Sequence, residues 1–359
     1  MTNPSPSRRI RVLIVDDSAI VRQLLTDILA ADPEIEVVGT AVDPIIARDK
    51  IKLLSPDVLT LDVEMPRMNG VEFLEKLMRL RPMPVVMVSS LTREGADVTL
   101  KALELGAVDF VAKPLKDLAS TLPALSEEIV AKVKGAARAH IRLTGPRRPP
   151  PPPQMATAPA AACSAELIAI GASTGGVETI TELLSTFPAA IPAVVIVQHM
   201  PEAFVPRFAA RLREALPFAV EPAADGKPLT PGRVLIAPGN QHLLVVRGKG
   251  GGLESRLSSA APVSGHRPSV DALFTSVAEA RPKAVGILLT GMGRDGAAGL
   301  LKMKEAGAVT IAQDEQTSTV FGMPRAAQEM NAATLVLPLP KIAAAIFNEP
   351  GLPGSKSGG

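Results

Sequence analysis

The stretch Leu167-Ile168-Ala169-Ile170-Gly171-Ala172-Ser173-Thr174-Gly175-Gly176 joins a short apolar run to a serine flanked by glycines. Residues 177–187 follow with apolar side chains at helical spacing. The pattern predicts a buried strand, a sharp turn that carries Ser173, and then a helix. Gly171-x-Ser173-x-Gly175 fits the nucleophile elbow, a turn that presents a serine hydroxyl above the edge of a sheet. The helix start behind it offers unpaired N–H groups to a developing negative charge.

Two other interpretations of this turn stay open. The first is an ordinary strand-to-helix connection that carries no chemistry. The second is the phosphate-binding loop of a dinucleotide-binding domain. That loop has a glycine where Ser173 stands and an acidic residue after the next strand, which is predicted at residues 193–197, and the sequence has neither.

Composition limits the class of protein. The length of 359 residues indicates two domains, and 47% hydrophobic with 21% charged residues is typical of a soluble globular protein. A net charge of +2 favours neither a nucleic acid nor a membrane as partner. Cys163 is the only cysteine, so an internal disulfide and a cysteine metal cluster are both excluded. No apolar run approaches the length of a membrane span, and we expect a cytoplasmic location without direct membrane insertion.

Residues 11–112 alternate apolar runs with amphipathic stretches. The expected strands are 12–15, 37–40, 58–61, 85–88 and 110–112, and the expected helices are 19–30, 45–54, 70–80 and 97–105. This alternation predicts an α/β domain with a doubly wound parallel sheet and helices on both faces.

Polar residues stand where the predicted strands end. Asp16 and Asp17 follow the first strand, Asp62 the third, Ser89 the fourth and Lys113 the fifth. Parallel strands bring these ends to one edge of the sheet, where three carboxylates suit Mg²⁺ and a lysine and a hydroxyl can contact a phosphoryl group. The site is therefore expected to accept phosphate on a carboxylate. A single aspartate at such a place would usually be a helix cap, but five matched residues at the ends of strands favour chemistry.

These residues, together with Met65-Pro66-x-Met68-Asn69-Gly70 and Lys113-Pro114, resemble the flavodoxin-like receiver domain of two-component response regulators over residues 11–118. The resemblance implies that Asp62 is the phosphoacceptor and that Asp16, Asp17 and Asp62 hold Mg²⁺. It further implies Lys113 as a supporting residue, Ser89 and Phe110 as a switch pair, and a sensor histidine kinase as phosphodonor.

A change of composition separates two domains. After a helix predicted at residues 122–139, the run Pro146–Pro153 and the Ala-rich residues to 162 read as a polyproline spacer, with a docking site for a proline-reading module as the alternative. We expect a disordered N-terminus at 1–9, a receiver domain at 10–125, a helix end and linker at 126–163, a catalytic domain at 164–349, and a disordered tail at 350–359.

The second half again alternates strands and helices. The expected strands are 167–170, 194–197, 284–289, 309–312 and 334–337, and the expected helices are 177–187, 204–216, 270–280, 325–330 and 341–347. Residues 234–236 and 243–246 predict an antiparallel hairpin across the turn 237–242. The domain is expected to be Rossmann-like with a β-hairpin.

Ser173, His199 and Asp295 each follow a predicted parallel strand, so they can converge at one rim. An imidazole can take the serine proton, and a carboxylate can fix the tautomer of that imidazole. Glycines on both sides of Met292 permit a tight turn whose N–H can donate to an oxyanion. Several residues compete for these roles: His242 and His266 as the base, and Asp225, Asp271 and Asp314 as the acid, whereas His140 is expected to be exposed.

The second half resembles the chemotaxis protein-glutamate methylesterase family. The motifs are Gly171–Gly176, Gln198-His199-Met200-Pro201, Pro238-Gly239-Asn240-x-His242, Arg267-Pro268-Ser269-Val270-Asp271 and Thr290-Gly291-Met292-Gly293-x-Asp295-Gly296. The resemblance implies a Ser173–His199–Asp295 triad that removes methyl groups from glutamyl esters on methyl-accepting chemotaxis receptors. It also implies deamidation of receptor glutamines and no cofactor in this domain.

Two other classes of function compete with this one. A response regulator with a DNA-binding output domain would carry a basic recognition helix, which the second half lacks, so we expect no nucleic-acid partner. A non-catalytic Rossmann-like module would not need three triad candidates at strand ends. For regulation, we expect the receiver to obstruct the Ser173 rim until phosphate on Asp62 shifts its packing.

Overall fold

The computed structural model describes residues 8–65, 68–90, 92–113, 118–140 and 164–347. The chain divides into two compact units, residues 1–144 and 145–359, which are described separately. The predicted tails, apart from residues 8 and 9, the predicted linker from residue 141 onward, and the motif residues Pro66 and Pro114 lie outside the described residues. The limits expected for the individual domains stay predictions.

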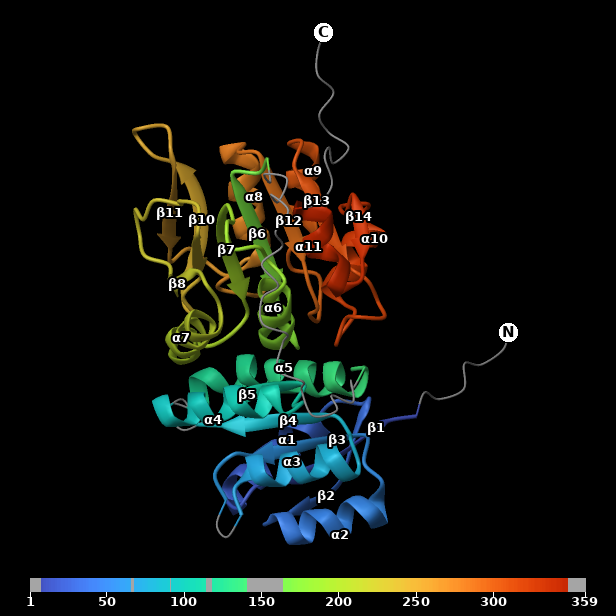
Figure 1. Ribbon diagram of the computed structural model, residues 1–359. Helices are drawn as coiled ribbons and strands as arrows, with labels where there is room; N and C mark the ends of the chain where they lie inside the picture. The colour runs from blue at the N-terminus through green and yellow to red at the C-terminus, as the bar shows by residue number, and fades with distance from the viewer. Residues whose placement is uncertain (1–7, 66–67, 91, 114–117, 141–163, 348–359) are drawn as a thin grey trace, which may run out of the picture. The chain divides into compact units, whose positions relative to one another are not determined.

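The N-terminal unit contains a parallel five-stranded sheet in the order β2-β1-β3-β4-β5 (Figure 1). Its strands are β1 (Ile10–Val15), β2 (Ile35–Ala41), β3 (Val58–Asp62), β4 (Val85–Ser89) and β5 (Asp109–Ala112). Its helices are α1 (Ala19–Ala30), α2 (Pro44–Leu54), α3 (Gly70–Leu80), α4 (Arg93–Glu104) and α5 (Leu118–Ala137). The predicted alternation and parallel sheet are confirmed.

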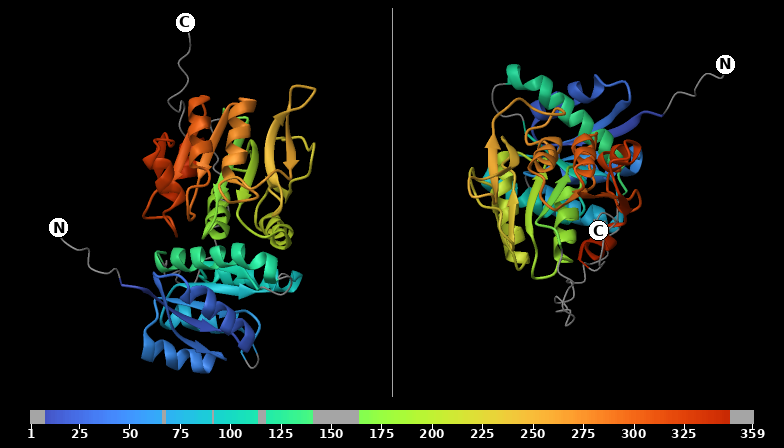
Figure 2. Two further views of the ribbon diagram at one scale, coloured as in Figure 1. Left: turned by 180° about the vertical axis from the view of Figure 1, so that it is seen from behind. Right: turned by 90° about the horizontal axis from the view of Figure 1, so that it is seen from above.

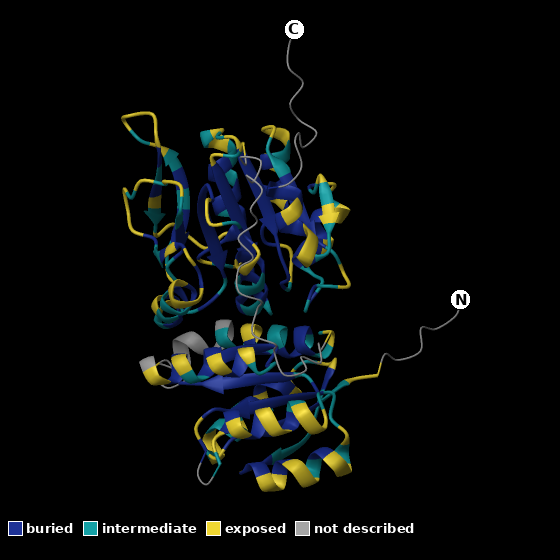
Figure 3. Ribbon diagram, viewed as in Figure 1, coloured by how far each residue is buried: buried dark blue, intermediate teal, exposed yellow. Residues whose placement is uncertain are grey.

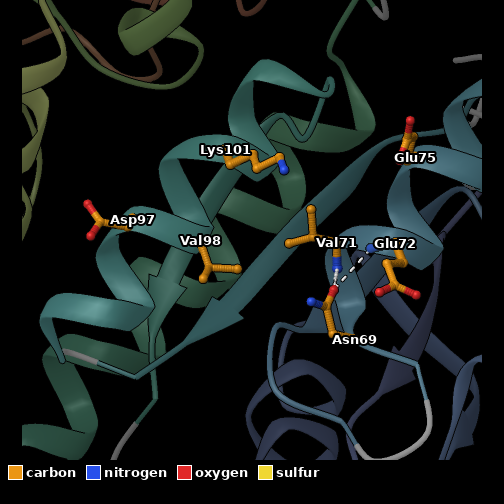
Figure 4. Close-up of a pocket in the computed structure, with 7 residues that line it drawn as sticks. All are labelled: Asn69, Val71, Glu72, Glu75, Asp97, Val98 and Lys101. Carbon is orange, nitrogen blue, oxygen red and sulfur yellow. Dashed lines mark hydrogen bonds between the residues drawn. The ribbon is translucent and has the colours of Figure 1, made fainter.

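Side-chain caps start the helices of this unit and so fix the loops at the carboxyl edge of the sheet. Ser18 accepts a hydrogen bond from Val21 N–H, and Asp43 and Thr92 cap α2 and α4 in the same way. Asn69 accepts from the N–H groups of Val71 and Glu72 at the start of α3 (Figure 4). These bonds satisfy N–H groups that a helix start leaves unpaired.

The C-terminal unit contains a parallel seven-stranded sheet in the order β14-β13-β12-β6-β7-β9-β8. Its strands are β6 (Leu167–Ala172), β7 (Ala193–Gln198), β8 (Ala219–Pro222), β9 (Arg233–Ile236), β12 (Ala284–Leu288), β13 (Val309–Gln313) and β14 (Leu335–Leu337). Its helices are α6 (Gly176–Ser185), the 3₁₀ turn η1 (Glu202–Phe204), α7 (Val205–Ala215), α8 (Val270–Ala280), α9 (Ala297–Glu305), α10 (Met323–Glu329) and α11 (Leu339–Phe347).

The predicted hairpin between residues 234–236 and 243–246 is wrong. β9 pairs in parallel with β7 and β8, whereas β10 (His242–Arg247) pairs antiparallel with β11 (Leu253–Ser258) in a separate two-stranded sheet. The connection at Gly239 packs directly on η1, where an added Cβ would lie 2.2 Å from the backbone nitrogen of Glu202. Because β9 has a parallel neighbour on each of its edges, it has no free edge for an antiparallel partner. The Lys249–Gly252 stretch supplies the hairpin turn instead, and the short edge strand β8 was not predicted.

β6 lies in the middle of the C-terminal sheet, at the point where the direction of the strand order changes. The chain continues from β6 to β7 on one side and adds β12 later on the other side (Figure 2). The strands β6, β7 and β12 are buried along their whole length (Figure 3). Ligands of doubly wound sheets bind beyond the carboxyl ends of the strands where the order changes. Within the described ranges, the structure has no helix that is both long and apolar enough to cross a membrane.

At Gly171, β6 lies very close to the first residue of α8. A Cβ added there would lie 2.1 Å from Cγ1 of Val270, the first residue of α8. We expect Gly171→Ala to lower the free energy of unfolding by about 1–3 kcal/mol, since overpacking forces the helix off the sheet. Denaturant unfolding followed by circular dichroism measures it. Gly250→Ala, at a position with no atom within 4 Å, is the control and should change nothing; equal stability of the two variants would contradict the prediction.

Candidate active site and phosphoacceptor site

The N-terminal unit gathers acidic side chains at the carboxyl edge of its sheet. Oxygen atoms of Asp16, Asp17 and Asp62 lie within 4.8 Å of one another. Asp16 and Asp62 are fully buried, and Asp17 is exposed. Nζ of Lys113 lies 2.7 Å from Oδ2 of Asp62 and 3.4 Å from Oδ2 of Asp16. The sheet therefore brings together four residues that the sequence predicted for this site.

The charges of this cluster are not balanced. Two buried carboxylates share the ammonium of Lys113, so one negative charge is left over before Asp17 is counted. Burial raises the pKa of Asp62 to about 6, and the nearby Asp16 adds to the rise although hydrogen bonding to Lys113 opposes it. Burial likewise raises the pKa of Asp16. Excess negative charge carried by oxygen donors fits a divalent cation such as Mg²⁺.

The predicted switch residues lie against neighbouring elements. The hydroxyl of Ser89 contacts Oγ1 of Thr99 on α4 at 2.7 Å and is fully buried. Its backbone carbonyl accepts from Lys113 N–H at 2.7 Å. Phe110 is buried on β5 with Nζ of Lys132 4.9 Å from its ring centroid. Ser89 therefore joins the end of β4 to both α4 and the end of β5.

A groove of about 340 Å³ lies between α3 and α4 (Figure 4). Its lining residues are Asn69, Val71, Glu72, Glu75, Asp97, Val98 and Lys101. None of the residues of the phosphoacceptor cluster lines it, so the groove is not part of that site.

In the C-terminal unit, three neighbouring strands position the predicted catalytic residues. Ser173 follows β6, His199 follows β7 and Asp295 lies in the loop after β12. The parallel ladder continues past the strand ends, because His199 N–H donates to Ala172 O at 3.1 Å and Ser173 N–H to Thr290 O at 3.0 Å. These bonds hold the Ser173 turn between the other two loops.

Asp295 is almost fully buried and accepts hydrogen bonds from several directions. Nε2 of His199 lies 2.8 Å from Oδ2. The start of α8 supplies Ser269 Oγ–H at 2.8 Å and the N–H groups of Val270 and Asp271 at 2.7 and 3.0 Å. Burial alone would raise the pKa of Asp295, but His199 and these N–H groups outweigh burial and lower it to about 2. The carboxylate is therefore ionised at neutral pH.

An ionised Asp295 determines the tautomer of His199. A carboxylate only accepts, so Nε2 of His199 carries a proton, and in the neutral ring Nδ1 carries the lone pair. Nδ1 is buried and has no hydrogen-bond partner within the described part of the chain. Ser173 is half-buried, and no hydrogen bond joins its hydroxyl to His199 among the described residues. A bond between nucleophile and base often forms only when substrate binds.

The competing histidines occupy other roles. His242 is buried, with Nδ1 accepting from Ser269 N–H at 3.2 Å and Nε2 donating to Ala261 O at 3.1 Å. His266 stacks on His199 with ring centroids 4.0 Å apart and an interplanar angle of 8°. His140 is exposed in the other unit, as expected.

The competing aspartates likewise have structural partners. Asp271 accepts from Gly299 N–H at 2.7 Å and from Ser264 Oγ–H at 2.9 Å. Asp225 accepts from Leu257 N–H at 2.8 Å, and Asp314 from Thr317 N–H at 2.9 Å. Among the described residues, Asp295 is the one of these four aspartates that forms a hydrogen bond with His199.

The loop that carries Met292 packs on the serine turn. A Cβ on Gly291 would lie 2.8 Å from Cβ of Ser173 and 2.2 Å from Sδ of Met323, so only glycine fits. Gly293 has φ +81°, a left-handed conformation that favours glycine. The backbone next to Met292 therefore lies beside the nucleophile candidate, where a donor to an oxyanion would be needed.

Two residues that support this arrangement were not singled out from the sequence. The buried Gln198 side chain donates through Nε2 to the carbonyls of Ser173 at 2.9 Å and His199 at 3.0 Å. Thr290 Oγ1–H donates to Thr174 O at 3.0 Å. Both residues stand in the motifs quoted above. Their hydrogen bonds to backbone carbonyls form only when neighbouring strands come together, so the spacing of residues along the sequence does not predict them.

A metal centre does not fit the histidine pair. Ligand atoms of His199, His266 and Asp295 lie within 4.8 Å of one another. Imidazole binds a metal through a lone pair in the plane of its ring, and parallel rings 4.0 Å apart direct these lone pairs along separate planes. The two rings as placed cannot both bind one ion.

A receiver-like cluster of carboxylates in one unit and a Ser/His/Asp cluster in the other define a response regulator with an effector unit of hydrolase type. Residues 168–346 match the family described as CheB methylesterase, and residues 12–122 match the response regulator receiver domain. A protein-glutamate methylesterase/protein-glutamine glutaminase of Hahella chejuensis is 56% identical over 94% of this chain and 95% of its own length. The corresponding protein of Xanthomonas campestris is 54% identical over 93% and 95%.

This chain belongs to the CheB methylesterase family and carries a response regulator receiver domain. The resemblance stated from the sequence and the expected methylesterase class are thereby confirmed. The solved structure of the Thermotoga maritima CheB methylesterase catalytic domain is 36% identical to this chain, covers 51% of it and 97% of that domain, and has a TM-score of 0.49.

The raised pKa of Asp62 predicts that Mg²⁺ affinity depends on pH. Below its pKa of about 6, Asp62 binds a proton that must leave before the carboxylate can bind metal. We expect the affinity of the full chain to be constant near pH 7–8 and to weaken toward roughly tenfold per unit below pH 6. Isothermal titration calorimetry measures it, with Asp49→Asn on exposed α2 as a control that keeps the pH dependence. Equal affinity at pH 7 and pH 5 would contradict this prediction.

Proposed function

We propose that this methylesterase hydrolyses glutamyl γ-methyl esters of methyl-accepting chemotaxis receptors, with Ser173 as nucleophile, His199 as base and Asp295 as its partner. The observation that carries the proposal is the 2.8 Å contact between His199 and an ionised Asp295 beside the Ser173 turn. The named relatives are protein-glutamate methylesterases, which supports the glutamyl ester as substrate.

In the proposed reaction, Ser173 Oγ attacks the ester carbonyl while Nδ1 of His199 takes the hydroxyl proton. The Met292 N–H donates to the oxyanion as the carbonyl becomes tetrahedral. His199 then returns the proton to the departing methoxy oxygen, and methanol leaves an acyl-enzyme. Water attacks this ester with His199 again as base, which yields the glutamate carboxylate and regenerates Ser173. Asp295 stabilises the imidazolium in both steps.

The same residues can release ammonia from a receptor glutamine. Attack on the side-chain amide would give the same acyl-enzyme, with His199 protonating the leaving nitrogen. The relatives' names include protein-glutamine glutaminase, which supports this second activity.

Substitution of the nucleophile tests the catalytic proposal. We expect Ser173→Ala to lower the rate of methanol release from methylated receptor membranes by about 10³-fold or more, because no other group can form the acyl-enzyme. Ser185→Ala, at an exposed serine that ends α6, the helix following the Ser173 turn, is the matched control and should keep wild-type activity. Undiminished methanol release by the Ser173 variant would rule out this mechanism.

We further propose that phosphorylation of Asp62 by a sensor histidine kinase relieves inhibition by the receiver domain. Asp16, Asp17 and Asp62 would hold Mg²⁺, which would neutralise charge on the phosphoryl group. Lys113, 2.7 Å from Asp62, would contact a phosphoryl oxygen. Ser89 would leave Thr99 for that oxygen, and the movement would reach Phe110 through the end of β5.

Removal of the receiver domain tests the inhibitory role. We expect deletion of residues 1–153 to raise basal methylesterase activity, and a small phosphodonor with Mg²⁺ to raise the activity of the full chain. Asp62→Asn should abolish the response to the phosphodonor while leaving basal activity in place, since its unphosphorylated charge cluster keeps Lys113 and Asp16. Activity that is unchanged or lower after the deletion would refute inhibition by the receiver.

A further inference from the structure

His266 lies at the end of a tight turn in the segment before α8. Val263 N–H donates to His266 O at 3.1 Å, and His266 N–H donates to Val263 O at 2.9 Å. The two residues between them, Ser264 and Gly265, have φ +52° and +79°. This is the two-residue turn with both central residues in the left-handed region, a conformation that an L-residue such as Ser264 rarely adopts. The two hydrogen bonds and the left-handed residues therefore give this turn a defined backbone conformation, although its two central residues are exposed to solvent.

Side chains fasten this turn to the catalytic unit. Ser264 Oγ–H donates to Oδ2 of Asp271 at 2.9 Å, and Asp271 N–H in turn donates to Asp295 at 3.0 Å. Arg267 donates to the carbonyls of Ser259 and Ala260 at 3.1 and 3.2 Å, which closes the base of the segment. The turn is thereby tied to the carboxylate that holds His199.

The turn also fixes the ring of His266. Its Nδ1 lies 2.8 Å from Ser264 O, and since a carbonyl only accepts, Nδ1 carries a proton. In this orientation the ring is parallel to that of His199 within 8° at a centroid distance of 4.0 Å. The ring is held by its own turn and covers one face of the other imidazole.

A histidine ring rotates about its Cβ–Cγ bond between two broad orientations. For His199, a half-turn would exchange Nδ1 with Cδ2 and Nε2 with Cε1, which would break the bond from Nε2 to Asp295 and move Nδ1 to the other side of the ring. The ring has to pass through a perpendicular orientation, which a parallel ring at 4.0 Å blocks on one face. Asp295 fixes the ring in its plane, and the stacked ring opposes motion out of that plane.

We propose that His266 is a positioning residue that holds the His199 ring with Nδ1 available to Ser173. This inference rests on the proposed function and adds the residue that keeps the base oriented. His266 exchanges no proton with substrate in this scheme, because its ring acts through its face. A neutral aromatic ring of similar size should therefore replace it, whereas removal of the ring should not be tolerated.

Two variants of the full chain test this role. We expect His266→Ala to lower kcat by about tenfold with KM within twofold of wild type, because the base is misoriented while the binding surface is kept. His266→Phe, which keeps a stacking face, should restore kcat to within about threefold. Val263→Ala, on the exposed side of the same turn, is the control and should match wild type.

The ¹⁵N chemical shifts of the histidine rings give a readout independent of activity, and the chain has only four histidines to assign. Neutral His199 should appear as the single Nε2–H tautomer in wild type and His266→Phe, and as a mixture in His266→Ala. Wild-type kcat and spectra in His266→Ala, or equal loss in His266→Phe, would overturn the inference. Activity that survives Ser173→Ala would instead refute the proposed function, while the spectra would still report on the orientation of His199.

Discussion

The C-terminal unit depends on one buried negative charge, the carboxylate of Asp295. It is 1% exposed and accepts hydrogen bonds from the first turn of α8, from the Ser269 cap and from His199. Burial of an ionised carboxylate is costly unless every oxygen is hydrogen-bonded, and here that condition is met by a helix start and an imidazole together. The same bonds that make the charge tolerable also select the tautomer of His199. The position of α8 and the lone pair on Nδ1 of His199 therefore both depend on the hydrogen bonds that Asp295 accepts.

The two units each place a carboxylate at the edge of a sheet, but the surroundings shift the pKa of the two carboxylates in opposite directions. The hydrogen bonds that Asp295 accepts outweigh the effect of its burial, and its pKa falls to about 2. Asp62 shares one lysine with Asp16, and its pKa rises to about 6. A carboxylate of the first kind stays charged and orients another group, whereas one of the second kind attracts a cation or a proton. The difference lies in the local hydrogen-bond donors, since Asp62 ends one buried strand of a parallel sheet and Asp295 lies in the loop after another.

Close packing around glycine fixes the remaining geometry. Gly291 lies against Ser173 and Met323, Gly171 lies against Val270, and Gly70 lies so near the Asp62 carbonyl that an added Cβ would be 1.9 Å from it. Each contact brings a loop with a functional side chain nearer to its sheet than any larger residue would allow. Gln198 and Thr290 then bridge the loops through backbone carbonyls. Packing and polar bonds therefore hold these loops against the sheet and against one another.

The sequence by itself determined the two parallel α/β units, nearly all their strands and the polar residues at the strand ends, because apolar periodicity and strand-end position are local properties of the chain. It left His199, His242 and His266 as competing bases, since spacing along a chain does not reveal which ring meets a carboxylate. Only the tertiary structure brings Asp295 to the first turn of α8 and into a hydrogen bond with His199, which supports the proposal that His199 is the base. It also places the hairpin in β10 and β11 instead of residues 234–246, because β9 pairs in parallel with β7 and β8, which are distant from it in sequence or join it only in the folded sheet, and so has no free edge. The stacking of His266 on His199 likewise arises only in the folded chain, where a turn and a strand end from separate segments meet.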